Sequence, residues 1–246
     1  MKNSVYQQIV EAYKANKSLL AVLIDPDKEN WDHLETVVGN ANESACDLFF
    51  VGGSLLTRDN LEACLDQIRI ESDIPTVIFP GSVQQVSDTA DALLFLSVIS
   101  GRNPELLIGN HVTAAPLLKP MDLEIIATGY MIIDGGRPTT VSYISNTNPI
   151  PANKPDIAAC TAMAGELLGL KLIYLDCGSG ADTPVSVDMV RAVRKSVDLP
   201  IIVGGGIKSR EQAKAIAEAG ANVIVVGNAI EENPGLIKDI SSALHN

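Results

Sequence analysis

The chain has 246 residues, 46% of them hydrophobic and only 4% aromatic, and 18 Lys and Arg against 30 Asp and Glu give a formal net charge of −12. This length and hydrophobic content support one large core or two small ones, which excludes a disordered chain or a small disulfide-stapled protein. The acidity argues against non-specific binding to nucleic acid or to an anionic membrane surface, because both attract basic patches. The same negative charge is also unfavourable for the binding of phosphorylated small molecules.

Cysteine spacing and apolar runs indicate the compartment. The four cysteines form no C-x-x-C pair and no metal-type spacing, which favours small buried side chains in a reducing cytosol. Residues 1–18 predict an amphipathic helix rather than a signal peptide. The longest apolar runs, such as Ala92–Val98, are too short to span a bilayer. We therefore expect a soluble cytoplasmic protein without a stable membrane anchor.

Short apolar runs alternate with segments of helical periodicity along the chain. Each run is almost continuously apolar, as expected of strands buried on both faces. The eight candidate strands are Leu19–Ile24, Asp47–Val51, Thr76–Phe79, Ala92–Ser97, Glu124–Ile133, Leu172–Leu175, Ile201–Val203 and Val223–Val226.

Capping signals mark several of the intervening helices. Ser209 is a candidate N-cap for a helix over Glu211–Ala219. Thr183-Pro184 predicts the start of another helix, because proline is favoured in a first helical turn. Asn30 is a candidate opening residue for a helix over Trp31–Glu43. Helices therefore separate the strands, as in a β-then-α repeat.

Two segments depart from this alternation. Pro80–Asp91 is weakly patterned and predicts no regular helix. Residues 135–155 form one long insertion rich in Pro, Asn and Thr, whose length favours a functional loop. Eight β-then-α units in about 250 residues predict an α/β fold, a single-domain (β/α)8 TIM barrel over residues 1–246, modified around its third helix. The alternative, an open doubly wound sheet, would normally carry G-x-G-x-x-G after its first strand.

Glycine-rich turns follow the last two strands, at the end of a barrel where the chemistry lies. Gly204-Gly-Gly-Ile207 follows the seventh run and Gly227-Asn228 follows the eighth. Glycines let backbone N–H groups approach an anion, and a helix N-terminus adds a favourable dipole. The pattern predicts a phosphate site, with tight turning as the alternative explanation, and it specifies no reaction.

Carboxylates end the first and sixth runs. Asp176 shares a strand face with Tyr174 and is a candidate general base or hydroxyl clamp, or else a helix cap. Asp25 with Ser54, which follows the second run, forms a minimal Mg²⁺ site, although an Asx turn would also explain Asp25. Lys28 is a candidate contact to an anionic leaving group. These two poles would suit a monophosphate and a metal-bound diphosphate.

Taken together, the motifs resemble the geranylgeranylglyceryl phosphate synthase family, and in particular its longer, group II branch. The resemblance extends in order over essentially the whole chain. It is carried by Asp25-Pro-Asp-Lys28, Gly52-Gly-Ser54, Phe79-Pro-Gly-Ser82, Leu96–Pro104, Thr128–Gly136, Asn148-Pro-Ile-Pro151, Tyr174–Gly180, Gly204-Gly-Gly-Ile207 and Gly227-Asn228.

The resemblance implies a Mg²⁺-dependent prenyltransferase that joins sn-glycerol 1-phosphate to a polyprenyl diphosphate, with a geranylgeranyl chain expected, in the first step of isoprenoid ether-lipid synthesis. It also implies a homo-oligomer, a dimer or a hexamer. Asp25 and Ser54 would hold the metal, and Asp176 would be the catalytic base, where the family usually has a longer Glu followed by Ala. Glycerol phosphate would be bound by Tyr174, Leu175, Asp176, Cys177, Gly178, Ser179, Gly180, Gly205, Gly206, Gly227 and Asn228.

The prenyl tail is expected in an apolar groove lined by Phe79, Pro80 and neighbouring Leu and Ile side chains from strands two to four, with at most peripheral membrane contact. Rival functions on the same scaffold are an FMN oxidoreductase, a sugar-phosphate isomerase or aldolase, and an inert barrel that binds prenyl or phosphate groups. Remaining side chains of interest are His111 (cleft or packing), Arg102 (diphosphate or structural pairing), Tyr143 (oligomer interface), and His33 and His245 (both expected to be solvated).

Overall fold

The computed structural model describes residues 4–27, 31–55, 57–58 and 60–245. The predicted (β/α)8 barrel is confirmed: eight parallel strands close in chain order, and β1 pairs with β8 with Leu19 opposite Val223. Lys28 and Asn30, for which the sequence predicts roles, lie outside the described residues. The strands are β1 (Leu19–Ile24), β2 (Leu48–Val51), β3 (Thr76–Ile78), β4 (Ala92–Val98), β5 (Glu124–Ile132), β6 (Leu172–Asp176), β7 (Ile201–Gly204) and β8 (Val223–Val226).

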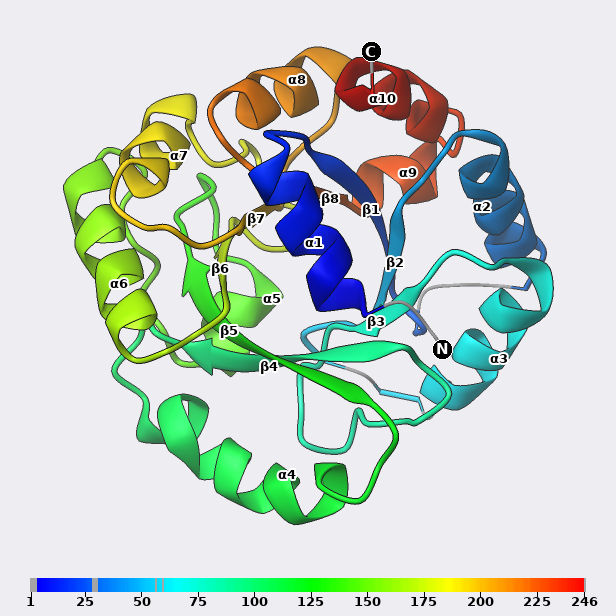
Figure 1. Cartoon of the computed structure of the whole chain (residues 1–246), viewed down its shortest axis with the longest axis horizontal. Coiled ribbons are helices and arrows are strands. Elements are labelled where there is room, and N and C mark those ends of the chain that lie inside the picture. Colours follow the sequence, from blue (N-terminus) through cyan, green and yellow to red (C-terminus); the bar gives the residue numbers. More distant parts are fainter. Residues whose placement is uncertain (1–3, 28–30, 56, 59, 246) are drawn as a thin grey trace.

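Helices form a ring around the barrel, with α1 lying across one end (Figure 1). None of the helices in the described ranges is long and apolar enough to cross a membrane. The helices are α1 (Val5–Lys14), α2 (Trp31–Glu43), α3 (Leu61–Glu71), the π-helical turn η1 (Glu105–Gly109), α4 (Asn110–Leu118), α5 (Thr140–Ile144), α6 (Pro155–Leu167), α7 (Val187–Arg194), α8 (Arg210–Glu218), α9 (Asn228–Glu232) and α10 (Leu236–His245).

The caps explain where two of these helices begin. Ser209 caps α8 as predicted, accepting a hydrogen bond from the backbone N–H of Gln212. The prediction that Thr183-Pro184 opens α7 is wrong, because the helix begins at Val187 with Ser186 as its N-cap. The backbone N–H of Thr183 instead donates to the carbonyl of Gly135 at 3.1 Å, which holds the segment before α7 against the loop that follows β5.

The barrel buries two apolar layers, which is why its strands are apolar on both faces. Alternate side chains such as Leu48, Leu94 and Ile202 fill the barrel interior. Their neighbours, such as Phe49 and Val203, pack outward against the helices. Because the period of a strand is two, each residue's place in the sequence decides whether it can reach the barrel interior.

The helical ring is interrupted between β3 and β4. Residues 79–91 form turns and bends and no helix, as predicted. α3 therefore precedes β3, and the next helix after it is α4, beyond β4; Figure 1 shows α3 and α4 on either side of this segment. The helix that would follow β3, which is the third helix of the β-then-α repeat and not α3, is therefore missing, as expected. Its absence leaves the outer side of β3 and β4 open to another apolar partner.

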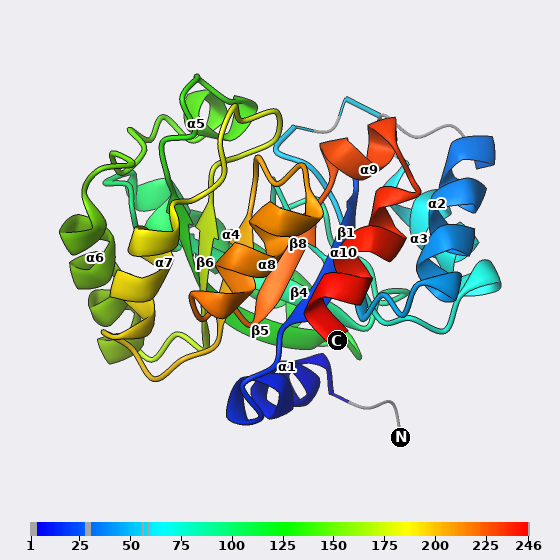
Figure 2. The same ribbon diagram turned by 90° about the horizontal axis from the view of Figure 1, so that it is seen from above.

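The predicted N-terminal helix closes the end of the barrel opposite α5 and α9 (Figure 2). α1 buries Val5, Ile9 and Ala12 on the interior core. Glu124, at the start of β5, fixes the helix by accepting hydrogen bonds from Ser4 Oγ at 2.5 Å and from the backbone N–H of Val5 at 2.7 Å. This end is therefore plugged, and a substrate has to enter from the carboxyl ends of the strands.

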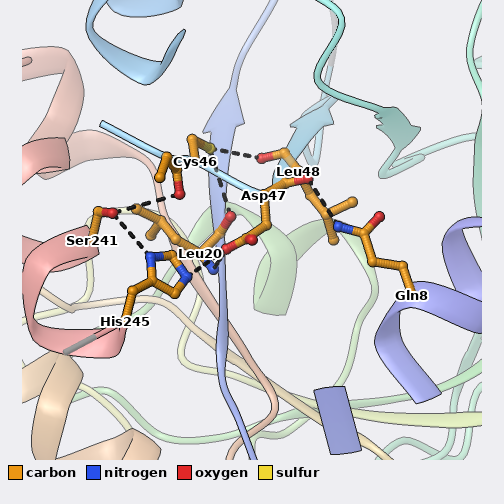
Figure 3. A network of polar contacts seen from close by, with 8 residues as sticks. Gln8, Leu20, Cys46, Asp47, Leu48, Ser241 and His245 are labelled. Atoms are coloured by element: carbon orange, nitrogen blue, oxygen red, sulfur yellow. Dashed lines mark hydrogen bonds and ion pairs between the residues drawn. The ribbon is translucent and has the colours of Figure 1, made fainter. Parts of the chain in front are cut away.

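A polar network ties the C-terminal helix to the same closed end (Figure 3). The expectation that His245 is solvated holds only in part, because its Nε2 lies 3.0 Å from Asp47 Oδ2 and its Nδ1 lies 3.1 Å from Ser241 Oγ. Asp47 also accepts from the backbone N–H of Leu20 at 2.8 Å. The network joins α10 to β1 and to the start of β2, so its role is structural.

Candidate active site

Glycine-rich loops from three strands lie together at the open end of the barrel. Gly178, Gly205 and Gly206 have positive φ values of 82°, 79° and 72°, a region that glycine enters without strain. A Cβ on Gly205 would lie 2.7 Å from both Asp176 Oδ1 and the backbone nitrogen of Gly178. The loops after β6 and β7 therefore approach each other more closely than side chains would permit.

Hydrogen bonds join these loops, which are distant in sequence. Ser179 Oγ donates to Asn228 Oδ1 at 2.7 Å, joining the β6–α7 loop to the residue that follows Gly227. The backbone N–H of Cys177 donates to the carbonyl of Gly204 at 3.2 Å. These contacts hold the glycine turns together as one cradle of backbone and hydroxyl groups, the arrangement that the predicted phosphate site requires.

Strand alternation divides the predicted glycerol phosphate residues into two groups. Tyr174 and Asp176 belong to the buried lining of the interior, whereas Leu175 and Cys177 pack in the outer core between strands and helices. Burial raises the pKa of the Cys177 thiol, with nearby Asp176 and Asp134 adding to the shift, so this thiol is an apolar packing group. Leu175 and Cys177 can meet a ligand only through their backbones.

Asp176 is the buried carboxylate of the site, with 6% of its surface exposed. Its Oδ1 accepts from the backbone N–H of Gly178 at 2.7 Å, and its Oδ2 accepts from the Tyr130 hydroxyl at 2.5 Å. Burial raises the pKa of Asp176, while these two hydrogen bonds oppose the shift by stabilising the ionised form. A carboxylate with a raised pKa, held by directed donors, is suited to accept a proton from a bound hydroxyl.

The sequence singled out Tyr174 but not Tyr130. Tyr130 is inward-facing on β5 and directly opposite Tyr174 on β6. Alternation along Glu124–Ile132 could have placed Tyr130 on the interior face, but only the closed barrel shows that its hydroxyl reaches Asp176. It is therefore a site residue that sequence reasoning missed.

The predicted Mg²⁺ site, Asp25 with Ser54, lies at the ends of β1 and β2. The half-buried Asp25 carboxylate lies against Gly53, where a Cβ would come within 3.1 Å of Oδ1, and Ser54 follows directly. Oδ1 also accepts from the backbone N–H of Asp27 at 3.2 Å, so the Asx turn is present as well. The described residues contain no cluster of three or more His, Cys, Asp or Glu side chains able to hold a metal.

This donor set fits Mg²⁺ better than a metal that needs a complete protein cage. One carboxylate and one hydroxyl leave the remaining positions for water and substrate oxygens, which is how Mg²⁺ commonly binds. Asp27 makes different contacts, since its carboxylate accepts from Thr57 Oγ1 at 2.8 Å and from the backbone N–H of Arg58 at 3.2 Å. It fastens the β1 loop to the segment before α3.

An apolar groove begins beside Ser54 and runs along residues 79–86, part of the segment that stands in place of a helix after β3. The prediction that Phe79 and Pro80 line it is confirmed. Strands two and three contribute no Leu or Ile, because Gly53 and Ser54 follow β2 and the strand leucines of the groove all come from β4. The sequence did not identify the walls formed by η1, α4 and α5. Further lining side chains are Val83, Val86, Leu94, Phe95, Leu96, Val98, Leu106, His111, Ala114, Leu118, Tyr130, Val141 and Ile144.

Of the other candidate side chains, His111 lines this groove, whereas Arg102 and Tyr143 do not. His111 is a groove residue: it is buried, its Nε2 lies 3.0 Å from Ser97 Oγ, and burial lowers its pKa, so a neutral ring is favoured. The Arg102 guanidinium donates to the carbonyl of Gly101 at 2.7 Å, which is structural pairing. Tyr143, in the long insertion, is 84% exposed, whereas Val141 and Ile144 of the same helix face the groove.

Fold and site together define an α/β barrel that pairs a glycine cradle with an apolar groove. The sequence model of the PcrB family matches residues 13–244. The geranylgeranylglyceryl phosphate synthase of Chitinophaga pinensis is 52% identical over 245 residues, covering 100% of this chain and 97% of that protein. That of Korarchaeum cryptofilum is 45% identical over 219 residues, covering 89% and 90%.

A solved structure supports the same assignment. The (S)-3-O-geranylgeranylglyceryl phosphate synthase of Thermoplasma acidophilum, in complex with its substrate sn-glycerol-1-phosphate, superposes with a TM-score of 0.92 at 31% identity, covering 98% of each chain. The chain therefore belongs to the PcrB family, the family of the geranylgeranylglyceryl phosphate synthases. It is an enzyme of that prenyltransferase type.

Proposed function

We propose that this enzyme joins sn-glycerol 1-phosphate to a polyprenyl diphosphate, with geranylgeranyl as the expected chain, and forms the first ether bond of an isoprenoid glycerolipid. The observation that carries the proposal is a junction: Tyr130 lines the apolar groove and also bonds to Asp176, beside the glycine cradle. A lipid-tailed substrate and a small anionic one would thus meet at one carboxylate. The sn-glycerol-1-phosphate bound to the Thermoplasma acidophilum relative supports the choice of acceptor.

The chemistry follows from this placement. The cradle around Gly205 and Gly206 would bind the phosphate and leave the far hydroxyl of the glycerol beside Asp176, whose Oδ1 already accepts from the Gly178 N–H. That hydroxyl attacks C1 of the prenyl chain and loses its proton to the carboxylate, while the C1–oxygen bond breaks and diphosphate leaves. Mg²⁺ bound at Asp25 and Ser54 would supply neutralisation of the leaving diphosphate. The groove holds the tail and excludes water from the reacting carbon.

The acidity of the chain is compatible with two anionic substrates. The proposed phosphate contacts are backbone N–H groups and hydroxyls, so the cradle itself needs no Lys or Arg. Asp25 and Asp176 are part of the negative charge, and each has a proposed use in the site. Approach to a lipid-tailed substrate would depend on the apolar groove rather than on net charge.

The positions of the lysines give little support to a rival aldolase reaction. An aldolase of the Schiff-base type needs a lysine at the carboxyl end of a strand. Lys171 precedes β6 and lies over the ring of Tyr6 in α1, at the plugged end of the barrel. Lys208, after the glycine turn, donates to the carbonyl of Asp182 on the exposed rim.

The assay that tests the proposal uses purified protein, Mg²⁺, sn-glycerol 1-phosphate and a series of C10 to C35 prenyl diphosphates, with products identified by mass. The expected result is a prenylglyceryl phosphate ether whose formation is lost on chelation and restored by Mg²⁺. The enantiomer, sn-glycerol 3-phosphate, is the matched control. Absence of an ether product with every chain length would contradict the proposal.

We also propose that copies of the chain associate through α6 and α4. Ile157, Met163, Leu167 and Leu168 are exposed on or just after α6, and Ile108, Val112 and Leu117 are exposed on or just before α4. Exposed apolar faces of this kind mark interfaces. Light scattering is expected to show a dimer or larger assembly for the unmodified chain and a smaller species for Leu167→Glu; an unmodified monomer would contradict the proposal.

A further inference from the structure

The ring of Tyr130 lies at the boundary between the groove and the acid–base group. It is almost fully buried, it lines the groove, and its hydroxyl reaches Asp176 Oδ2 on the neighbouring strand. Nothing in the proposed reaction requires this hydroxyl to touch either substrate. Its hydrogen bond is made to the carboxylate itself.

Neighbouring aromatic rings fix where the hydroxyl points. The Tyr130 ring meets Tyr174 edge-to-face, with centroids 5.3 Å apart at 89°, and meets Phe79 at 5.7 Å and 62°. Phe79 in turn stacks on Tyr174 at 5.2 Å. Three packed rings leave Tyr130 little freedom to rotate, so its hydroxyl is held at one position above Asp176.

The hydroxyl is also fixed as a donor. Burial raises the pKa of Tyr130 well above its ordinary value, and the adjacent Asp176 charge raises it further, so the phenol keeps its proton. With Gly178 N–H on Oδ1 and Tyr130 on Oδ2, each carboxylate oxygen has one directed donor and can still accept a second hydrogen bond. An accepting site is therefore left for the proton of a substrate hydroxyl.

We propose that Tyr130 is a positioning residue that orients the Asp176 carboxylate toward the glycerol hydroxyl. The proposal rests on the proposed function. Tyr130 keeps its own proton throughout, and the proton lost by the glycerol goes to Asp176. Because the same ring forms part of the groove wall, the seating of the prenyl tail and the orientation of the base depend on one side chain.

Tyr130→Phe tests the proposal, since it removes the hydroxyl and keeps the ring. The turnover number kcat is expected to fall by about 10- to 100-fold, the range for one hydrogen bond to a charged group, with little change in the KM for sn-glycerol 1-phosphate. The acid limb of the pH–rate profile should move to higher pH, because removing a donor to the ionised form raises the pKa of Asp176. Tyr13→Phe, on α1 at the plugged end, is the matched control.

A double-mutant cycle tests whether Tyr130 acts through Asp176. In an Asp176→Asn background, adding Tyr130→Phe should cost much less in turnover than it does in the unmodified enzyme. Equal losses in both backgrounds would overturn the positioning role. Thermal unfolding of each variant separates a general loss of structure from the expected effect on a folded enzyme.

A measurement without turnover separates this inference from the proposed function. Titration of the Asp176 side-chain carboxyl by ¹³C NMR should show a higher midpoint in Tyr130→Phe than in the unmodified protein. An unchanged midpoint overturns the inference even if the unmodified enzyme makes the ether. If the midpoint rises and the unmodified enzyme makes no ether, the proposed function fails, and Tyr130 is left as a structural partner of Asp176.

Discussion

The hydroxyl of Ser179 donates a hydrogen bond to Asn228 Oδ1 at 2.7 Å, across 49 positions of sequence. The first residue lies in the loop after β6 and the second follows β8, so the contact spans the loop of β7 between them. It holds both sides of the glycine cradle at a fixed separation. A ligand bound by loops that are already ordered does not lose binding energy in ordering them.

Ser179→Ala should therefore weaken acceptor binding without changing the chemical step. We expect the KM for sn-glycerol 1-phosphate to rise by about 2- to 10-fold, which corresponds to one neutral hydrogen bond, with kcat nearly unchanged. Ser196→Ala, on the outside of the barrel, where the hydroxyl donates to the carbonyl of Ala192, is the control. A fall in kcat with an unchanged KM would contradict this role.

Gly206→Val should disrupt the glycine cradle more severely. The position has a φ of 72°, and a Cβ there would lie 2.6 Å from the carbonyl oxygen of Thr183. We expect the Kd for sn-glycerol 1-phosphate, measured by calorimetry, to rise by about tenfold or more. Gly39→Ala on α2, where a Cβ meets no atom within 4 Å, should leave binding unaltered. An unaltered Kd in the valine variant would argue against a phosphate pocket at this turn.

Asp25→Ala tests the predicted Mg²⁺ site at Asp25 and Ser54. If Asp25 supplies the carboxylate for Mg²⁺, product formation should be lost and should not return at higher Mg²⁺, while Ser54→Ala should raise the Mg²⁺ concentration needed for half-maximal rate. Asp32→Ala, on the exposed first turn of α2, is the control carboxylate. An unchanged Mg²⁺ dependence in Asp25→Ala would refute the assignment.

The network of Asp47 with His245 predicts a pH-dependent stability. Burial raises the pKa of Asp47, and the neighbouring His245 opposes this shift, so His245→Ala should raise the pKa of Asp47 further. A raised carboxyl pKa stabilises the fold only while the group is protonated, and that contribution is lost as the pH rises through the folded pKa. The variant should be less stable by about 1 kcal/mol near pH 6 and equal to the parent near pH 3.

Urea unfolding at a series of pH values measures this difference. His33→Ala, at a half-buried position of α2 away from this network, is the matched histidine control. A loss of stability that is the same at every pH would show that His245 acts by packing alone.

The sequence alone determined the barrel, because that information is local and periodic. Apolar runs such as Val223–Val226 predict strands buried on both faces, and glycines at 204–206 predict close backbone approach whatever the surroundings. The Ser209 cap of α8 was predictable for the same reason, since its hydrogen bond spans three residues. The start of α7 was not, because the contact of Thr183 with Gly135 joins positions far apart in sequence.

The tertiary structure decided which side chains meet. The bond from Tyr130 to Asp176 depends on the register of β5 against β6, and the groove walls from η1, α4 and α5 depend on the missing helix between β3 and β4. A core leucine and a groove leucine look alike in sequence, because both are apolar and on a strand or helix. Only closure of the barrel places some of them beside an opening and the others beneath a helix.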